Sequence, residues 1–561
     1  MGEQPLIIVV GGLGHFDGAW KRLEARLRKQ GFAGDWHFHD TRSPQNLFRG
    51  ARVRDLSLAL IAKINHLAKD RRRIILVGHS AGGMVVRDAY LVAAGAYADD
   101  SQRLEWWDKV EAVLLFASLN RGYRPYASAS WALGLALMKL VTLQWLFLTP
   151  PFSFALGWLM ELEKGSFFVT DLRLAWMRHF HRRGQEHRPF VVQFLGDIDG
   201  VVAREDVRDT EAFANSYTVT IKGADHNNLF DPHAPPAAEG FTQILQVFQN
   251  PDPQARNPAQ AQTLEVSGPR LVVFVLHGIR DGNSGWVTDL TEAIEQRCKD
   301  QEINRRQLEN IEGADGTFME PPVLVDRSTY GWFSAIKFAL PWVRRSNLPW
   351  FLDRYSYHMA RNPDVQFHFI GHSNGTYILG TSLLQVSSLK FERVYLAGCV
   401  LPREFAWQAM LPDRVATLVN QCSSEDWPVG GLCRGLQRIG FSDVGTGGVD
   451  GFDDLEGNPY STQTRWFNGN HGKALQRPNQ AQIVDYVLGQ TTHSPLMPDP
   501  TGADWCPQPP ARFMFRMQVC ASLLAVISIV LVCLAGYGLA HHHEGLVMIA
   551  AVLLYFVLDT V

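Results

Sequence analysis

The chain has 561 residues, of which 46% are hydrophobic and 19% are charged, and its formal net charge at pH 7 is −3. This length exceeds what one hydrophobic core supports, so two or three domains are expected, and the composition is that of a globular protein. The small negative charge, without a basic stripe, argues against a nucleic-acid partner. The seven cysteines have no metal-ligand spacing and favour reduced thiols in the cytosol over a disulfide framework.

The first residues, MGEQPLIIVVGG, are expected to form a strand. They lack the charged start, the long apolar stretch and the cleavage site of a signal peptide. From there to residue 250, short apolar runs alternate with helix-like segments, which predicts an α/β domain with a mostly parallel sheet covered on both faces. The apolar runs are Leu6–Val10, Ile74–Val77, Val110–Phe116, Phe190–Leu195 and Tyr217–Ile221.

Ser80 stands in a tight Gly-His-Ser-Ala-Gly turn between an apolar strand and an apolar helix. Such a turn exposes the hydroxyl, and the small residues Gly78 and Gly82 relieve the crowding around it. The helix that follows points its free N–H groups at a developing oxyanion. This Gly-x-Ser-x-Gly nucleophile elbow resembles that of the α/β-hydrolase superfamily, which implies an acid and then a histidine further along the chain.

In the first domain the expected acid is Asp199 and the expected histidine is His226. They follow the predicted strands FVVQFLGD and SYTVTIKG, and therefore belong to the same edge of the sheet as Ser80. Asp197 is the rival acid. Valine follows the chosen aspartate three positions later, at Val202, a register that the family often shows.

Residues 121–188 have the place and length of the cap that this family commonly inserts. The central stretch Trp131–Met160 contains a single charged residue, Lys139. We interpret it either as helices packed over the site or as an apolar lid that admits acyl chains or touches a bilayer. A membrane span is disfavoured, because Lys139 falls within the run and Pro150-Pro151 breaks it.

A second unit begins after the linker at residues 251–267, so the chain is predicted to contain two tandem α/β-hydrolase domains, residues 1–250 and 268–490. The motif returns as FHFIGHSNGTYIL, with Ser373 as the nucleophile. Asp426 and His471 complete the second triad in the same chain order, and Glu425 is the rival acid. The expected strands lie within Arg270–Gly278, Phe367–Ile370, Val394–Leu396 and Ala416–Asn420.

The resemblance also implies an oxyanion hole in each domain, formed by two backbone N–H groups. In the second domain the sequence His277-Gly278-Ile279 fits the family's pattern, so the donors would be Ile279 and Asn374. In the first domain Gly11 stands in place of that histidine, and the donors would be Leu13 and Ala81.

A Pro-rich linker at residues 491–511 precedes an apolar tail at residues 512–561. Phe513–Leu539 is long enough to cross a bilayer, whereas Leu546–Leu558 is marginal. Arginines before the first span favour a transmembrane helical hairpin with both catalytic domains in the cytosol. The alternative is one span followed by an interfacial helix. Because the triads end before Gly489, we expect the tail to supply location rather than chemistry.

These patterns predict a membrane-anchored serine hydrolase that resembles lipases and carboxylesterases and cleaves carboxylic esters, with lipid esters favoured. No cofactor and no metal are expected. Thioesterases and acyltransferases use the same triad. The competing hypothesis is a membrane scaffold or regulatory protein in which one or both hydrolase domains are inactive. The sequence leaves the oligomeric state open.

Overall fold

The computed structural model describes most of both predicted domains and the start of the tail. The chain divides into two compact units, which are treated separately here. One comprises Met1–Ser267 with Phe351–Pro363 and Val386–Ser388, and the other comprises Gly268–Trp350, Asp364–Gln385 and Leu389–Val561. The described residues are 4–12, 17–40, 52–97, 102–123, 161–181, 187–200, 202, 215–252, 268–279, 285–308, 323–331, 333–489, 511–541, 543, 545–550 and 552–553.

The first unit contains a six-stranded sheet in the order β2-β1-β3-β4-β5-β6, and every neighbouring pair is parallel. The central strands are continuous apolar runs because helices bury both of their faces. The strands are β1 (Leu6–Val10), β2 (Asp35–His39), β3 (Ile74–His79), β4 (Val110–Phe116), β5 (Phe190–Gly196) and β6 (Ser216–Ile221).

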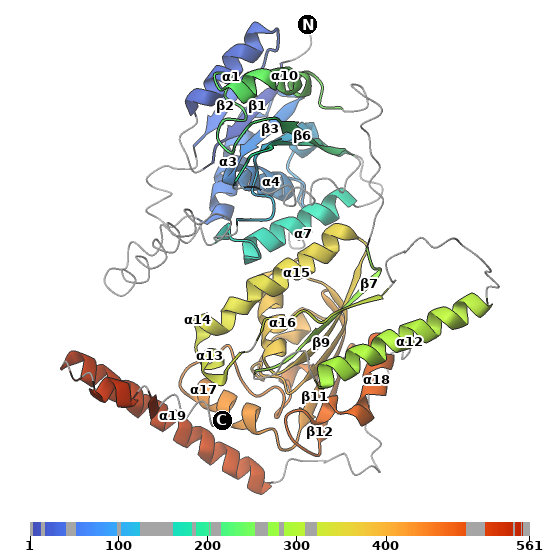
Figure 1. The fold of residues 1–561 in the computed structure, drawn as a ribbon, viewed down its shortest axis with the longest axis vertical. Helices are drawn as coiled ribbons and strands as arrows, with labels where there is room; N and C mark the ends of the chain where they lie inside the picture. The colour runs from blue at the N-terminus through green and yellow to red at the C-terminus, as the bar shows by residue number, and fades with distance from the viewer. Residues whose placement is uncertain are drawn as a thin grey trace. The chain divides into compact units, whose positions relative to one another are not determined.

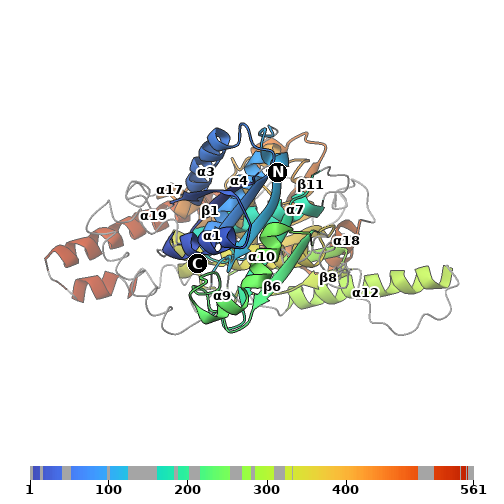
Figure 2. The ribbon, with the colours of Figure 1, turned by 90° about the horizontal axis from the view of Figure 1, so that it is seen from above.

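Helices α1 and α10 lie side by side in two views of the ribbon (Figures 1 and 2). Their side chains Trp20 and Ile244 share one buried cluster with Val9 and Val77 of the sheet. Helix α4, which begins directly after Ser80, contacts β1, β3 and β4 as well as α3 and α7. The helices of this unit are α1 (Asp17–Lys29), α3 (Val53–Leu67), α4 (Ala81–Ala93), α7 (Phe167–His181), α9 (Pro235–Glu239) and α10 (Phe241–Gln249).

The second unit repeats the arrangement. Its six parallel strands have the order β8-β7-β9-β10-β11-β12, which matches the first sheet strand for strand. The predicted α/β class and the parallel sheets are therefore confirmed for both units. The strands are β7 (Leu271–Leu276), β8 (Val323–Asp326), β9 (Gln366–His372), β10 (Phe391–Ala397), β11 (Val415–Ser423) and β12 (Ser461–Phe467).

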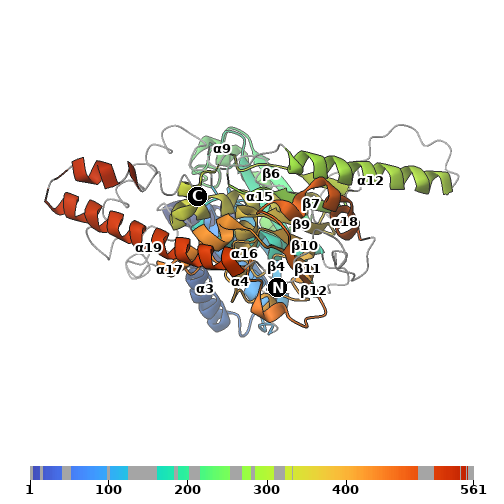
Figure 3. The ribbon, with the colours of Figure 1, turned by 90° about the horizontal axis from the view of Figure 1, so that it is seen from below.

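The described part of the second unit contains two buried apolar clusters, of which the first includes residues of the sheet. One contains residues of α12 and α18, which are neighbours in Figures 1 and 3. The other contains Tyr377 of α16 together with residues of α13, the π-helical turn η7 and α17. The helical elements of this unit are α12 (Trp286–Leu308), α13 (Ala335–Ala339), α14 (Pro341–Arg344), α16 (Asn374–Gln385), η7 (Pro428–Cys433), α17 (Arg434–Arg438), α18 (Arg477–Val487) and α19 (Ala511–Ala540). Helix α15 (Leu348–Arg361) is divided, since its residues from Phe351 onward belong to the first unit.

Several expectations concern segments outside the described residues. They include the cap centre Trp131–Met160, nearly all of the linker at 251–267 and the Pro-rich stretch before α19. Within the part of the chain that is described, none of the helices combines the length and the apolarity that a membrane crossing requires. The transmembrane hairpin is therefore not confirmed and stays a prediction.

Candidate active site

Ser80 and Ser373 each occupy a strained turn between a strand and a helix. Among the described residues other than glycine, only Ser80 (φ 53°), Ala117 (φ 42°) and Ser373 (φ 51°) have positive φ. This conformation is costly for a residue with a Cβ atom and persists where the surrounding structure enforces it. The N–H of Ser80 donates to Phe116 O at 3.0 Å, and that of Ser373 donates to Ala397 O at 3.2 Å. Both turns are thus tied to the end of the neighbouring strand.

Glycine is required where α4 packs against β1 and where α16 packs against β7. A Cβ atom on Gly82 would lie 2.3 Å from Val10 O, and one on Gly375 would lie 2.5 Å from Leu276 O. Such distances are well below van der Waals contact with backbone that cannot move aside. The second glycine of the sequence motif therefore lets the helix approach the sheet and fixes the direction of the serine.

In the first unit, the imidazole of His226 joins Ser80 to Asp199. His226 Nε2 lies 2.9 Å from Ser80 Oγ, and Nδ1 lies 3.0 Å from Asp199 Oδ2. The Asp199 side chain has no exposed surface, and its Oδ1 accepts a hydrogen bond from Val202 N at 3.0 Å. The rival acid Asp197 instead accepts the N–H of Gly223. The His226 imidazole thus lies between a hydroxyl and a buried carboxylate, an arrangement that is suited to proton transfer.

In the second unit, His471 and Asp426 form the equivalent pair. Nδ1 lies 2.7 Å from Asp426 Oδ2, and the fully buried carboxylate accepts Val429 N at 2.9 Å. The rival Glu425 is exposed. Ser373 is 4% exposed. All of these residues are described, and no hydrogen bond joins Ser373 to His471.

The contact surface beside the second histidine differs from that in the first unit. Gly398 has φ 54°, and a Cβ atom there would lie 2.6 Å from His471 Cε1. Ala117 follows the corresponding strand of the first unit with a similar φ. His471 therefore occupies space that an alanine at position 398 would deny it.

Two of the four expected oxyanion-hole donors, Ala81 and Asn374, begin a helix directly after a serine, and the assignment of all four stays a prediction. Ala81 and Asn374 are the first residues of α4 and α16, so their N–H groups have no partner within the helix. Leu13 lies outside the described residues. Ile279 directly follows Gly278 in the chain. A Cβ atom added to Gly278 would lie 2.7 Å from Ser373 Cβ. The loop after β7 thus passes directly over the serine.

Thr329 and Tyr330, which the sequence analysis did not single out, hold this loop in place. The Tyr330 hydroxyl donates to His277 O at 2.7 Å and its ring stacks on the His277 ring. His277 Nε2 lies 2.8 Å from Thr329 Oγ1. Nothing in the local sequence reveals this contact, because the partners are about fifty residues apart.

The histidine before each serine also was not anticipated. His79 Nε2–H donates to the backbone oxygen of His226 at 2.9 Å, and His372 Nε2–H donates to that of His471 at 3.3 Å. Burial lowers the pKa of His79 to about 4 and lowers the pKa of His372 well below its usual range. Both rings are therefore neutral at physiological pH and donate through one nitrogen.

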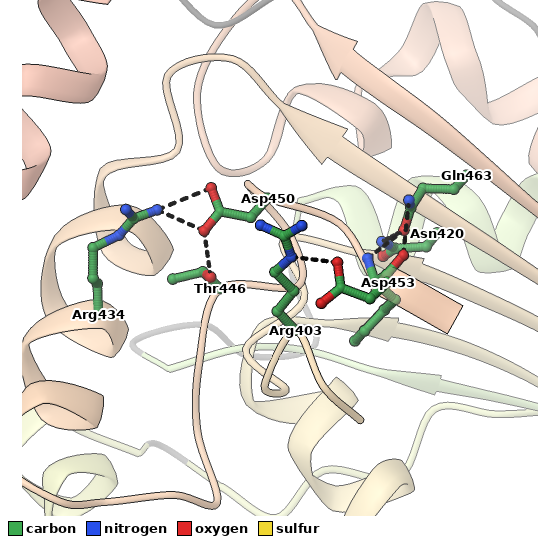
Figure 4. Close-up of polar contacts among 8 residues, drawn as sticks. Arg403, Asn420, Arg434, Thr446, Asp450, Asp453 and Gln463 are labelled. Carbon is green, nitrogen blue, oxygen red and sulfur yellow. Dashed lines mark hydrogen bonds and ion pairs between the residues drawn. The ribbon is translucent and has the colours of Figure 1, made fainter. Parts of the chain in front are cut away.

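A network of hydrogen bonds and ion pairs involves residues of the loop between β11 and β12 (Figure 4). Asn420 Nδ2 donates to Gly447 O in this loop at 2.9 Å. The N–H of the next residue, Gly448, donates to Cys399 O at 2.7 Å. The loop therefore crosses the ends of β10 and β11. Figure 4 shows the contacts Asn420–Gln463, Arg434–Asp450, Thr446–Asp450 and Arg403–Asp453.

No group of three or more His, Cys, Asp or Glu side chains in the described part of the chain is arranged to hold a metal ion. His226 has both ring nitrogens directed toward side chains, Ser80 and Asp199, whereas His471 contacts Asp426 through Nδ1.

Comparison with known proteins identifies the first unit. The model of the alpha/beta hydrolase family matches residues 7–239. The sequence matches no curated protein.

Similar solved structures include a monoacylglycerol lipase from Paleococcus ferrophilus (16% identity, 44% of this chain and 95% of that one, TM-score 0.28). Others are the phospholipase PlaB from Legionella pneumophila (16%, 46% and 62%, TM-score 0.33) and a bromoperoxidase from Bacillus anthracis (15%, 44% and 92%, TM-score 0.29).

Proposed function

We propose that this chain, which belongs to the α/β-hydrolase superfamily through residues 7–239, is a serine hydrolase that cleaves carboxylic esters. The observation that carries the proposal is the position of His226, within hydrogen-bond distance of both Ser80 Oγ and Asp199 Oδ2. The positive φ of Ser80 supports it independently, because strain of this kind gathers at functional sites.

The proposed reaction has two steps. Ser80 Oγ attacks the ester carbonyl while its proton passes to His226 Nε2, and the carbonyl oxygen becomes an oxyanion facing the N–H of Ala81. The C–O bond then breaks as His226 returns the proton to the departing alcohol, which leaves an acyl-serine. Water attacks the acyl group through the same base and releases the carboxylic acid. Asp199 stays ionised and orients the imidazole throughout.

We propose that the second unit performs the same chemistry with Ser373, Asp426 and His471. The strained φ of Ser373 and the 2.7 Å contact of His471 with Asp426 support this. The missing hydrogen bond between Ser373 and His471 favours the competing hypothesis, in which the second domain is inactive. A thioesterase or acyltransferase would use the same atoms, so the class of bond cleaved is part of the proposal.

We further propose that the substrate is a lipid and that the tail binds a bilayer. The apolar stretch Trp131–Met160 supports the first part. For the second, α19 exposes large apolar side chains along its length, with Phe515 68%, Val526 57% and Ile529 53% exposed. Exposed apolar surface of this extent marks interaction sites. Flotation of the purified chain with phosphatidylcholine vesicles tests this. Recovery of all the protein in the unbound fraction would contradict it.

Fluorophosphonate labelling of the full chain tests the catalytic proposal. The wild-type protein should be labelled on Ser80 and Ser373. Ser80→Ala and Ser373→Ala should each lose one label and keep the other, because each triad is built from its own unit. Labelling of Ser80 alone would identify the second domain as inactive, and labelling of neither serine would refute the proposal.

A further inference from the structure

The start of helix α19 is docked on the second unit. Met517 and Ala521 have no exposed surface, and Met514 packs against the cluster that contains Leu432 and Leu436. These three positions recur at helical spacing and share one face. Neighbouring residues on other faces are open to solvent, including Phe515 at 68%. Figures 1 and 3 show α19 beginning alongside α17.

The contact with η7 is close and depends on a glycine. A Cβ atom on Gly430 would lie 2.1 Å from Met517 Cε, so the end of the methionine side chain occupies the space that glycine leaves open. Arg438, at the end of α17, donates to Gln518 O at 2.8 Å and also bonds the Ser522 hydroxyl. Both apolar and polar contacts therefore hold the first turns of α19.

The turn that receives Met517 also donates hydrogen bonds to the proposed catalytic acid, Asp426. Gly430 N–H donates to Asp426 O at 3.0 Å, and Val429 N–H donates to Asp426 Oδ1 at 2.9 Å. The other carboxylate oxygen faces His471. Single π-helical turns are rare and often lie at functional sites. A displacement of this turn would move the carboxylate that orients His471.

We propose that Met517 is a positioning residue of the second active site: through Gly430 it holds the turn that fixes Asp426, and the tail helix is therefore a structural part of the second catalytic unit. This inference rests on the proposed function of that unit. It reverses the expectation that the tail supplies location alone.

The test uses the full-length chain in detergent. Met517→Glu should displace the docked face and slow fluorophosphonate labelling of Ser373 by on the order of tenfold to a hundredfold, since small displacements of catalytic groups have effects of this size. Met517→Leu keeps an apolar side chain and should restore the wild-type rate. Ala511→Glu, which adds the same charge at an exposed position of the same helix, is the matched control and should leave labelling unchanged.

Two further measurements separate this inference from the proposed function. Labelling of Ser80 in each variant reports whether the first unit is intact. Amide hydrogen exchange over residues 426–433 reports the turn directly, and Met517→Glu should accelerate it even if Ser373 never reacts. Failure of wild-type Ser373 to react would refute the proposed function of this unit, whereas unchanged exchange in Met517→Glu would overturn the docking role. Faster exchange with undiminished labelling of Ser373 would overturn the positioning role.

Discussion

His79 donates a hydrogen bond from Nε2 to the backbone oxygen of His226, over 2.9 Å. The contact joins the residue before Ser80 to His226, and His372 repeats it with His471. His79 and His372 therefore each connect the strand that precedes the serine to the loop that carries the proposed base. The same contact occurs in both units. We therefore expect it to hold the loop of the histidine in place beside the serine.

Substitution of His79 should slow the first site through the loss of this donor. In a Ser373→Ala background, we expect His79→Phe to lower the rate of Ser80 labelling by roughly tenfold, because the lost hydrogen bond is worth about 1 kcal/mol and the carbonyl is left unpaired. His79→Gln, which can donate from a similar position, should retain more activity. Equal rates for the two variants would show that the hydrogen-bond donor at position 79 does not contribute.

Asp199 and Asp197 provide a matched pair for the assignment of the acid. Asp199→Asn should lower turnover at the first site by on the order of 10³- to 10⁴-fold, because the imidazole loses its orienting carboxylate. Asp197→Asn should have little effect, since that side chain bonds Gly223 instead. Steady-state hydrolysis of a p-nitrophenyl ester in the Ser373→Ala background measures both. The reverse ranking would reassign the acid.

Acid should destabilise the second unit through His368. This histidine lies in β9 and bonds Val487 O, and burial lowers its pKa to about 4 from an ordinary 6.5. Between those values the unfolded chain binds a proton that the folded chain does not, so stability falls as pH decreases from about 6.5 to 4. The loss for such a shift is on the order of 3 kcal/mol. Thermal unfolding across this range should show a shallower pH dependence in His368→Gln. A pH dependence of thermal unfolding equal to that of the wild type would contradict this role of His368.

Removal of residues 511–561 should separate the two sites. The first unit has no residue in the tail, so Ser80 should react as in the full chain. The second unit loses the side chain that contacts Gly430, so labelling of Ser373 should fall. Site-resolved mass spectrometry of the labelled serines measures both in one sample. Full labelling of Ser373 in the shortened protein would be incompatible with the role assigned to Met517.

Much of the fold could be predicted because the central strands are apolar on both faces. Runs such as Leu6–Val10 and Val110–Phe116 coincide with β1 and β4. The strands absent from the predicted sheets, β2, β8 and β12, lie at sheet edges. Edge strands are partly open to solvent and carry polar residues, as in STQTRWF of β12. Their partners lie far away in the sequence, so no local pattern marks them.

The order of serine, acid and histidine could be predicted because these residues follow strands that end at one sheet edge. Supporting residues could not be predicted in the same way. Tyr330 reaches His277 across a long connection, and Met517 reaches Gly430 from beyond a Pro-rich linker. A signal for His79 was present, because Gly-His-Ser occurs in both motifs, but its meaning depends on a backbone oxygen that the sequence does not reveal.

The positive φ of Ser80 and Ser373 lowers the folding stability of the two residues that are proposed to act as nucleophiles. Glycine adopts this conformation without the penalty that a Cβ atom brings, and relief of such strain is worth about 1 kcal/mol or more. Ser80→Gly should therefore be inactive yet melt at a higher temperature than Ser80→Ala. Under the proposed function, each unit gives up part of its folding free energy to hold a serine hydroxyl at the turn between strand and helix.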